Sequence, residues 1–550
     1  MRVFVKRNRR RPDDDRFTSV LLVEGVRVPA GKRSRGRPRK DAPPQRTRVV
    51  HRVLANLTKL PPDLIGLVES YCRGDKLSAD PDRSCLGPCF GQLAALSALA
   101  QSVGITAALG SSRRGRLALF LVLARVAHRR SRLSAVRWAA DQAVAQALGL
   151  SRFDEDDLYA TLDWIETQQA RVEIELARRR PASTLFLYDV TSSYFEGQLN
   201  ELAAHGYNRD GKRYKKQIVV GLLTDEQGEP VAVRVYRGNT ADPKTVADPV
   251  RFLAAELGAK EVVFVGDRGM LKSGPRADLG AVGFRFLTAL TDAQVRPLLQ
   301  KSLLQIELFD EKVAEADVNG RRLLLRLNPE TRERHRGRRA DQLAKVRAKL
   351  AQRNAFVREH PRADEQASLR QARGLLVGYR LDRFVDARLA GREVELAVDE
   401  TKKADVELLD GCYVLETDVP KEAMDAATGH LRYMDLQKVE RDFRTMKTGL
   451  LDIRPIFLRK AERTRAHAFV TMLALKLVRA LESRVKDLGI TAQDALDRLA
   501  GVRLVTFAEP ELGLWRLPGR YAAPQQEILD RLPPLPAPML SLAPHRATGA

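Results

Sequence analysis

The pattern of apolar and polar positions divides the chain into blocks of different secondary structure. Near the N-terminus, FTSVLLVEGVRV and TRVVHRVLANL have the apolar, β-branched character of strands and predict a hairpin. The segment between them, GKRSRGRPRKDAPPQ, is rich in proline and arginine and predicts a loop. Residues 61–180 change to helical periodicity, as apolar side chains recur at helical spacing from Leu119 to Ala127.

Short apolar runs replace the helical pattern from about Ser183. Five of them predict strands: STLFLYDV, KQIVVGLLTD, PVAVRVYRG, EVVFVGDRG and GFRFLTAL. The turn EQGE joins the second and third strands as a hairpin, and DPKTVADPVRFLAAELG predicts a helix before the fourth. This order predicts an α/β fold with a mixed sheet.

Residues 296–428 have the pattern of an insertion into this fold. Four short runs predict strands, KSLLQIELF, RRLLLRLN, REVELAV and GCYVLETD, around a long basic helical segment from Thr331 to Arg373. Two strong helical patterns follow, MDLQKVERDFRTMKTGLL and ERTRAHAFVTMLALKLVRALESRVKDLG. We expect the tail from Thr491 to be extended.

The chain is strongly basic, which narrows the class of its partner. It has 550 residues, with 94 Lys and Arg against 70 Asp and Glu, and a formal net charge of +24. Such an excess favours nucleic acid or a lipid surface. No run of about 18 apolar residues and no signal-peptide pattern is present, so we expect no membrane partner. Only four Cys occur, which predicts a reducing cytosol.

Two carboxylates come directly after buried strands. Asp189 follows LFLY, and Asp267 follows VVFVG. A single Asp in such a position is more often a turn residue. Two of them at one rim of a sheet, with a third carboxylate from a packed helix, would supply the oxygen ligands that two Mg²⁺ ions about 3.5–4 Å apart require.

The helical segment YMDLQKVERDFRTMK contains the candidate third carboxylate. Tyr433, Glu440 and Lys447 are seven residues apart and therefore share one stripe of a helix. Asp435 and Asp442 point to other sides of it. The alternative is that this run is a charged, solvated helix face, and periodicity alone does not decide between the two.

Several segments together resemble the successive blocks of bacterial insertion-sequence transposases. They are YDVTSSYFEG, GYNRDGKRYKKQIVVGLLTDEQGEPVAVRVYRGNTADPKTV, FVGDRGM, YMDLQKVERDFRTMK and RAHAFVTMLALKL. More narrowly, they are similar to DDE transposases of the insertion-sequence-four superfamily, which carry a Tyr-Arg-Glu-Lys signature. Tyr433, Glu440 and Lys447 match this signature, but Leu436 occupies the Arg position. Arg444, one turn after Glu440, is the candidate to replace that phosphate contact.

The resemblance implies a ribonuclease H-like catalytic domain, with Asp189, Asp267 and Glu440 as its DDE triad. It implies two Mg²⁺ ions, for which Mn²⁺ can substitute, and a homodimer that acts on double-stranded DNA. The reaction implied is cleavage at the terminal inverted repeats of an insertion sequence and strand transfer into target DNA. The location implied is the bacterial cytoplasm, in association with the nucleoid. Tyr433 and Lys447 would contact phosphates.

These observations predict six regions. They are a basic N-terminal hairpin with its loop (1–60), a helical DNA-binding region (61–180), the first part of the ribonuclease H-like domain (181–295), a β-rich insertion with a basic helix (296–428), the second part of that domain with the catalytic Glu helix (429–490) and a C-terminal tail that is a candidate for dimerisation (491–550).

Candidate DNA contacts lie outside the triad. RGRPRK resembles an AT-hook core, in which Arg35 and Arg37 would enter a narrow A·T-rich minor groove. The alternative is a solvated basic linker. Arg113 and Arg114 belong to an arginine cluster suited to phosphate contacts. The basic helix in the insertion either contacts DNA or packs the insertion.

Three functional classes remain open. The first is an active transposase. The second is a ribonuclease H-like nuclease that cuts DNA without strand transfer. The third is a non-catalytic DNA-binding protein derived from a transposase. The intact set of acids disfavours the third class. The long insertion and the Tyr/Lys stripe disfavour the second.

Overall fold

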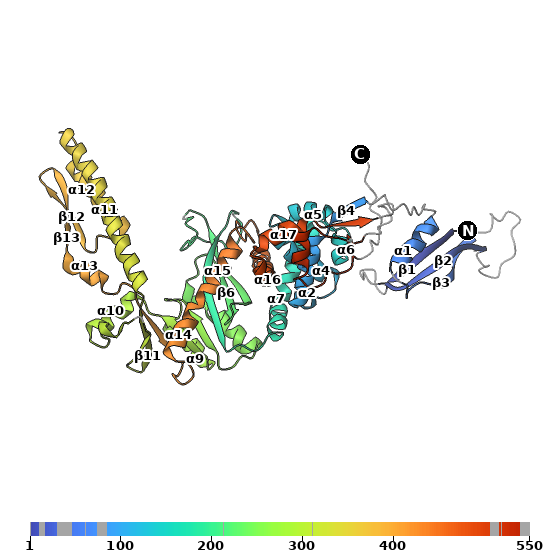
Figure 1. Ribbon diagram of the computed structural model, residues 1–550, viewed down its shortest axis with the longest axis horizontal. Coiled ribbons are helices and arrows are strands. Elements are labelled where there is room, and N and C mark those ends of the chain that lie inside the picture. The colour runs from blue at the N-terminus through green and yellow to red at the C-terminus, as the bar shows by residue number, and fades with distance from the viewer. Residues whose placement is uncertain are drawn as a thin grey trace, which may run out of the picture.

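The computed structural model of the chain is elongated, with four parts arranged along its length (Figure 1). It describes residues 2–9, 17–29, 47–60, 62–73, 85–197, 199–212, 214–310, 312–506, 516–518 and 520–538. A small N-terminal sheet lies at one end and a helical arm at the other, with a helical bundle and a large sheet between them. Within the described residues, no helix is both long and apolar enough to cross a membrane.

The N-terminal part is a three-stranded antiparallel sheet in the order β1-β2-β3. β2 (Phe17–Pro29) pairs with β3 (Thr47–Asn56), which confirms the predicted hairpin. β1 (Arg2–Arg9) was not predicted, because its apolar run is only Val3–Val5 and the rest of the strand is polar and basic. Helix α1 (Pro62–Arg73) packs on this sheet around Val20, Leu57 and Ile65. The AT-hook-like segment with Arg35 and Arg37 lies outside the described residues.

The second part is a helical bundle built around α16 (Ala461–Val485), which is buried along most of its length. The helices before the large sheet are α2 (Gly91–Ser102), α3 (Ile105–Leu109), α4 (Arg113–Ala127), α5 (Arg132–Ala140), α6 (Val144–Leu148) and α7 (Glu155–Arg178). α16 packs between α4, α7 and the sheet edge at β7. The helical pattern predicted for residues 61–180 is therefore confirmed, but its core includes a helix from far along the chain.

Part of the predicted tail is folded onto this bundle rather than extended. α17 (Ala492–Ala500) buries Leu496 and Leu499, and β15 (Arg503–Thr506) pairs with β4 (Cys85–Cys89). α18 (Ala523–Leu529) follows and buries Ile528. The expectation of an extended tail was wrong here, because the apolar residues of α17 recur on one helix face and complete the bundle core.

The third part is an eight-stranded sheet in the order β10-β11-β14-β9-β8-β5-β6-β7. Its strands are β5 (Leu185–Tyr194), β6 (Gln217–Asp225), β7 (Pro230–Arg237), β8 (Val263–Gly266), β9 (Arg285–Ala289), β10 (Ala314–Val318), β11 (Arg321–Leu327) and β14 (Cys412–Thr417). β8 is parallel to both β5 and β9, and the other pairs are antiparallel. The mixed sheet predicted from the sequence is confirmed.

Both faces of the sheet are covered. Leu185 and Leu187 of β5 belong to the core shared with the bundle, whereas Phe186 and Tyr188 face a second core. That second core lies under the short helix α8 (Ala247–Arg251), its continuation Phe252–Glu256, and α9 (Ser273–Ala281). Burial on both faces explains why these strands have continuous apolar runs.

The predicted insertion is not a separate β-rich domain. β10, β11 and β14 instead extend the central sheet. Leu324 and Leu415 face one core of the sheet, and Leu323 and Leu325 face another. KSLLQIELF is not a strand, since it follows α10 (Asp292–Gln300) and includes only a 3-10 turn at Ile306–Leu308. The part that projects from the sheet is mainly helical.

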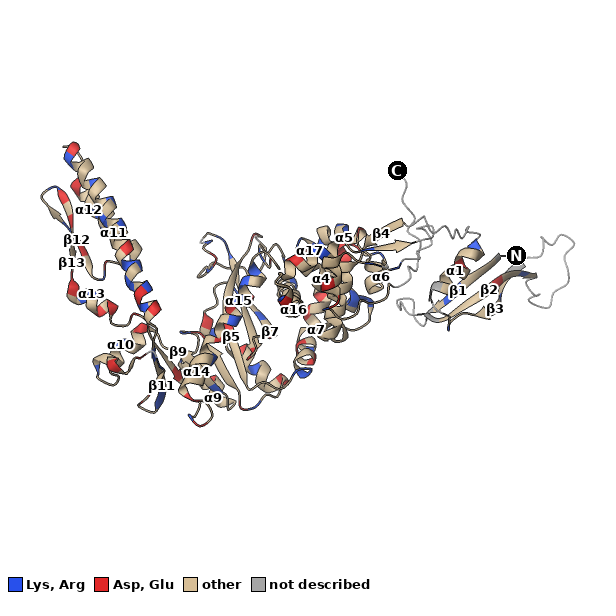
Figure 2. Cartoon of the chain, in the orientation of Figure 1, with Lys and Arg blue, Asp and Glu red and all other residues tan. Residues whose placement is uncertain are grey.

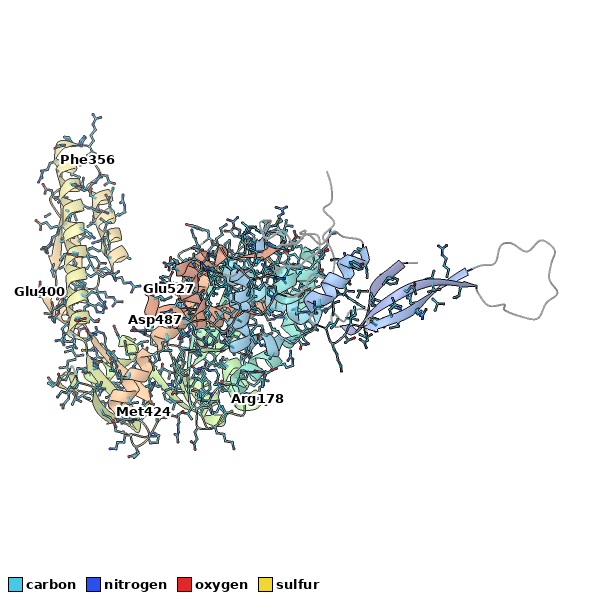
Figure 3. The ribbon with its side chains drawn as sticks, turned by 45° about the vertical axis from the view of Figure 1, so that its right-hand side comes forward. Arg178, Phe356, Glu400, Met424, Asp487 and Glu527 are labelled. Atoms are coloured by element: carbon cyan, nitrogen blue, oxygen red, sulfur yellow. The ribbon has the colours of Figure 1, made fainter. Side chains whose placement is uncertain are left out.

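The projecting arm has a core of its own. It consists of α11 (Pro329–Glu359), α12 (Glu365–Tyr379), the hairpin β12 (Val385–Ala390) and β13 (Glu393–Val398), and α13 (Glu400–Glu407). The predicted single helical segment is broken before Pro361, as expected for a residue before proline, and Asp364 caps α12 by accepting from Gln366 N at 2.8 Å. Phe356 lies at the tip of the arm (Figure 3).

The basic helix α11 both packs and exposes charge. Val346, Leu350 and Val357 are buried in the arm core. Other positions carry exposed Lys and Arg, which Figure 2 shows along the helix: Arg334, Arg336, Arg338, Lys345, Arg347 and Lys349. The helix therefore packs the arm, which is one of the two roles considered for this segment. The outer face of α11 does not take part in the arm core.

A buried ion pair joins the bundle to the sheet. The Glu173 side chain on α7 is fully buried and accepts from Arg234 on β7 at 2.8 Å, and also from Gln169 and the Val233 amide. We expect Glu173→Ala to lower the free energy of unfolding by about 3–5 kcal/mol, because it leaves the buried Arg234 without a counter-charge. Denaturant unfolding followed by circular dichroism measures this change.

Glu175→Ala is the matched control on the same helix. Glu175 pairs with Arg171 and Arg179 at the surface, where such pairs contribute about 0–1 kcal/mol. Equal unfolding midpoints for Glu173→Ala and Glu175→Ala would contradict the role assigned to the buried pair.

Candidate active site

Asp189 and Asp267 lie side by side at one edge of the sheet. β5 and β8 are adjacent and parallel, with Tyr188 opposite Gly266, so the next residue on each strand is one of the two aspartates. Each carboxylate accepts a hydrogen bond from the following backbone amide, at 2.7 Å for Val190 and 2.6 Å for Arg268. The strand positions predicted from the sequence therefore do converge.

The third carboxylate comes from α15 (Leu436–Lys447), which packs across β5. Its buried face consists of apolar residues including Val439, Phe443 and Met446, and this leaves Glu440 on the exposed side. Glu440 is close enough to act electrostatically on Asp189: burial first, then the charges of Asp267 and Glu440, raise the pKa of Asp189 to about 7. The three carboxylates thus belong to one electrostatic cluster.

The donor atoms of this cluster are those that a hard cation prefers, but the carboxylates are not yet close enough together to bind one. Within the described residues, no group of three or more His, Cys, Asp or Glu is gathered closely enough to hold a metal ion. The donors are all carboxylate oxygens, as Mg²⁺ requires. The charge of Asp267 raises the pKa of Asp189 more than the charge of Arg209 lowers it, so the protein's own cation does not fully compensate the negative charge at Asp189. The residues present fit a divalent cation that draws them together.

Tyr433 is bound to the cluster itself. It lies on α14 (Ala426–Met434), and its hydroxyl donates to Asp267 Oδ1 at 3.3 Å. Burial and the charge of Asp267 raise the pKa of the Tyr433 phenol, so it remains a neutral donor. The structure places Tyr433 as a residue that orients Asp267, whereas the sequence suggested a phosphate contact.

Lys447 is held in a buried ion pair. Its ammonium lies 2.9 Å from Asp210 Oδ1, and Arg454 pairs with the same carboxylate. Asp210 also accepts from the backbone amide of Tyr194 at the end of β5. The phosphate contact that the resemblance implies for Lys447 stays a prediction. Asp210 was missed in the sequence, where the only signal is a single acid within the basic run NRDGKRYKK.

The other residues of this helical segment lie where the helical periodicity predicts. Leu436, at the position expected to be Arg, is buried, and Arg444 is exposed. Asp442 points away from the cluster and pairs with Arg479 of α16 at 3.0 Å. Asp435 pairs with Lys438 at 2.9 Å. The exclusion of Asp435 and Asp442 from the site is confirmed.

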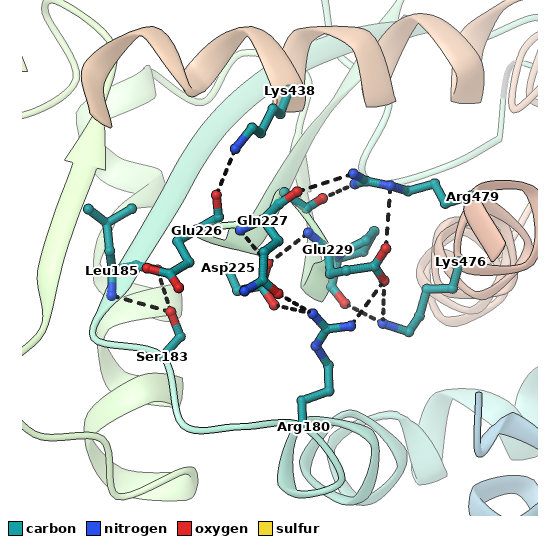
Figure 4. A network of polar contacts seen from close by, with 12 residues as sticks. Arg180, Ser183, Leu185, Asp225, Glu226, Gln227, Glu229, Lys438, Lys476 and Arg479 are labelled. Atoms are coloured by element: carbon teal, nitrogen blue, oxygen red, sulfur yellow. Dashed lines mark hydrogen bonds and ion pairs between the residues drawn. The ribbon is translucent and has the colours of Figure 1, made fainter. Parts of the chain in front are cut away.

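A polar network fixes α15 over the sheet (Figure 4). The turn between β6 and β7 lies at its centre: Lys438 of α15 donates to the Glu226 carbonyl at 2.9 Å, and Arg479 of α16 bonds to the Gly228 carbonyl. Gly228 has φ +80°, and a Cβ there would lie 2.9 Å from the Lys438 Cβ. The turn therefore needs glycine for the close approach of α15.

The same network ties the turn to the bundle. Arg180, just after α7, pairs with Asp225 at 2.9 Å, and Lys476 of α16 donates to the Pro230 carbonyl at 3.0 Å (Figure 4). Glu229 lies between Arg180, Lys476 and Arg479. The position of α15, which carries Glu440, thus depends on a network that joins it to α16 and to Arg180 after α7, which lie far apart in the sequence.

The arginines predicted to contact phosphates lie at the start of α4. Arg113 is partly engaged, since it pairs with Asp157 at 3.1 Å, and Arg114 is exposed. His467 of α16 is buried: Arg132 lies 3.0 Å from its Nδ1, and the Ile453 carbonyl lies 3.2 Å from its Nε2.

The comparisons with known proteins return structures of transposases. No family model matches the chain, and no curated protein matches it. Among solved structures, a piggyBac transposase synaptic complex with hairpin DNA is similar at 8% identity and a TM-score of 0.37, over 70% of this chain and 69% of that one. A Mos1 transposase paired-end complex with the left transposon end matches at 11% identity and a TM-score of 0.15, over 28% and 53%. A pre-cleavage Mos1 transpososome matches at 11% and 0.14, over 31% and 58%.

The buried Asp210 pair generates one prediction. We expect Asp210→Ala to lower the free energy of unfolding by about 3 kcal/mol or more, because both Lys447 and Arg454 then lose their shared counter-charge. Asp242→Ala is the control, since Asp242 pairs with Arg209 nearer the surface, and should cost about 1 kcal/mol or less. Urea unfolding compares the two, and a smaller loss for Asp210→Ala than for Asp242→Ala would contradict this placement.

The buried histidine generates a second prediction. Burial first, then the charges of Arg132 and Arg125, hold the pKa of His467 well below 6.5. Between pH 7.5 and 5.5 only the unfolded state therefore gains a proton here, so the folded state loses about 1.4 kcal/mol relative to His467→Gln. Unfolding of both proteins at the two pH values measures this loss, with the exposed His205→Gln as control. An identical pH slope in wild type and His467→Gln would contradict it.

Proposed function

We propose that this chain is a DDE-type DNA transposase that cleaves DNA at insertion-sequence ends and joins them to target DNA. The observation that supports it most directly is the cluster of Asp189, Asp267 and Glu440 at one sheet edge, with the charge of Glu440 acting on Asp189. The net charge of +24 favours a nucleic acid as the substrate. The spacing of Tyr433, Glu440 and Lys447 agrees with the insertion-sequence-four signature.

The three carboxylates would hold two divalent ions, Mg²⁺ or Mn²⁺. Such ions, when bound, activate the attacking oxygen and stabilise the leaving oxygen of an in-line displacement at phosphorus. The chain's own residues orient the site: Tyr433 donates to Asp267, and the network on Lys438 and Arg479 sets the position of the helix that carries Glu440. The Lys447–Asp210 pair attaches the end of that helix to β5.

The finer features of the proposal follow from the family resemblance. They are membership of the insertion-sequence-four superfamily, action in the bacterial cytoplasm, and a homodimer that brings two transposon ends together. Arg114, Arg444 and the outer face of α11 are exposed and cationic, and are therefore the candidate phosphate contacts among the described residues.

The decisive variant is Glu440→Gln, which removes one carboxylate charge while nearly preserving shape. We expect it to abolish cleavage and joining in Mg²⁺ and to leave DNA binding within about twofold, because the exposed cations that would bind phosphates are separate residues. The assay incubates a linear donor with the DNA ends that flank the gene, a target plasmid and Mg²⁺, and counts nicked ends and joined products. Chelation of the metal should have the same effect.

Asp435→Asn is the matched control. Asp435 immediately precedes the same helix and points away from the cluster, so this variant should cleave at the wild-type rate. Cleavage by Glu440→Gln at the wild-type rate would refute the triad. Nicking without joined products by the wild type would favour the second class, a nuclease without strand transfer. DNA binding without metal-dependent cleavage would favour the third.

A further inference from the structure

One loop carries two unusually exposed aromatic side chains. Among the large hydrophobic residues of the described chain, Tyr214 and Tyr207 are the most exposed, at 95% and 82%, and both lie between β5 and β6. Phe457 is 67% exposed on a neighbouring segment, which is bonded to this region through the Glu196 amide and the Ile456 carbonyl at 3.0 Å. Single exposed hydrophobic residues are common, but a group of them marks an interaction surface.

The described part of this loop, residues 205–212 and 214–216, lies next to the carboxylate cluster. The Arg209 amide donates to Ser192 Oγ at 2.8 Å, and Ser192 is three residues after Asp189 on β5. The following residue, Asp210, pairs with Lys447 of α15. The loop is therefore attached to both the strand of Asp189 and the helix of Glu440, and Tyr207 lies two residues from the first attachment.

The backbone around Tyr207 is held by its own hydrogen bonds. The Asn208 side chain accepts from the Asp210 and Lys212 amides at 2.9 and 3.1 Å, and the Tyr207 carbonyl accepts from Gln217 Nε2 at 3.1 Å. An aromatic ring on a fixed backbone loses little conformational entropy when it binds a partner.

The charge on the loop identifies the class of partner. Arg209, Lys212 and Lys215 lie close to the tyrosines in the sequence. Arg209 pairs with Asp242 and Lys215 pairs with Glu196, and the Arg209 guanidinium lies 5.7 Å from the centre of the Tyr207 ring. Aromatic rings interleaved with cations are typical of surfaces that bind single-stranded nucleic acid, where bases stack and phosphates are neutralised. Protein interfaces, in contrast, are depleted in Lys.

We propose that Tyr207 and Tyr214 stack on unpaired bases of the DNA strand that enters the carboxylate cluster. The loop would hold separated nucleotides beside the phosphate to be cut, while Lys212 contacts the backbone between them. This inference rests on the proposed function for its partner, DNA, but depends on different residues from the triad.

The test compares two DNA probes in the absence of divalent metal, at one salt concentration. One is a short blunt duplex, and the other is the same duplex with a single-stranded overhang that contains 2-aminopurine. Wild type should bind the overhang more tightly and change the 2-aminopurine fluorescence. Tyr207→Ala and Tyr214→Ala should each weaken overhang binding by about 5- to 150-fold for one stacked base, and leave blunt binding within about twofold.

Conservative and distant variants make the result specific. Tyr207→Phe and Tyr214→Phe keep the ring and should retain overhang binding. Tyr71→Ala removes a tyrosine of similar exposure, 77%, from α1 in the N-terminal part, and should behave as wild type (Figure 1). Because the loop tyrosines are almost fully exposed, their removal should not impair folding.

Three outcomes overturn the inference. They are equal loss of blunt and overhang binding in the Ala variants, overhang binding unchanged by either substitution, and a change of oligomeric state that leaves overhang binding intact, which would make the loop an interface between copies of the chain. Failure of the wild type to cleave DNA in Mg²⁺ would instead contradict the proposed function, which the stacking assay does not measure.

Discussion

Parallel pairing of β5 with β8 is the constraint on which the candidate site depends. It brings Asp189 and Asp267 to the same edge of the sheet, in adjacent positions of the register. This closeness has an electrostatic cost, which is visible in the pKa of Asp189, raised to about 7 by burial and by the charges of Asp267 and Glu440. The packing on both faces of the sheet has to hold these residues against that repulsion, and a bound cation would relieve it.

The candidate site also requires the position of α15, and contacts on two sides of this helix determine that position. Apolar residues such as Val439 and Phe443 pack toward β5, while Lys438 and Asp442 take part in the network on the β6–β7 turn (Figure 4). The exposed side is left for Glu440. Arg180 after α7 and residues of α16 hold this turn, so one polar network joins the bundle, the sheet and α15.

The arm is connected to the site through the sheet itself. β11 and β14 lie on either side of the arm in sequence and pair with each other within the sheet. Glu416 on β14 is bonded to Arg276 and Arg321, both at distances of 2.7–2.8 Å; burial alone would raise its pKa, but the two arginines lower it. This charged centre joins α9 and β11 to β14 at the base of the arm, whereas the outer helix of the arm has a cationic surface.

Local patterns determined much of this protein. Runs of apolar residues were sufficient to predict β5, β6, β7 and β8, and helical spacing was sufficient to separate Glu440 from Asp435 and Asp442, because both depend only on the geometry of a single element. Only the tertiary structure decided what lies beside each element: that the strands flanking the arm join the sheet, that Lys447 is buried against Asp210, and that Tyr433 bonds to Asp267. These contacts join residues far apart in the chain, and their energies depend on burial and on opposite charges brought together by folding, which no local pattern of residues records.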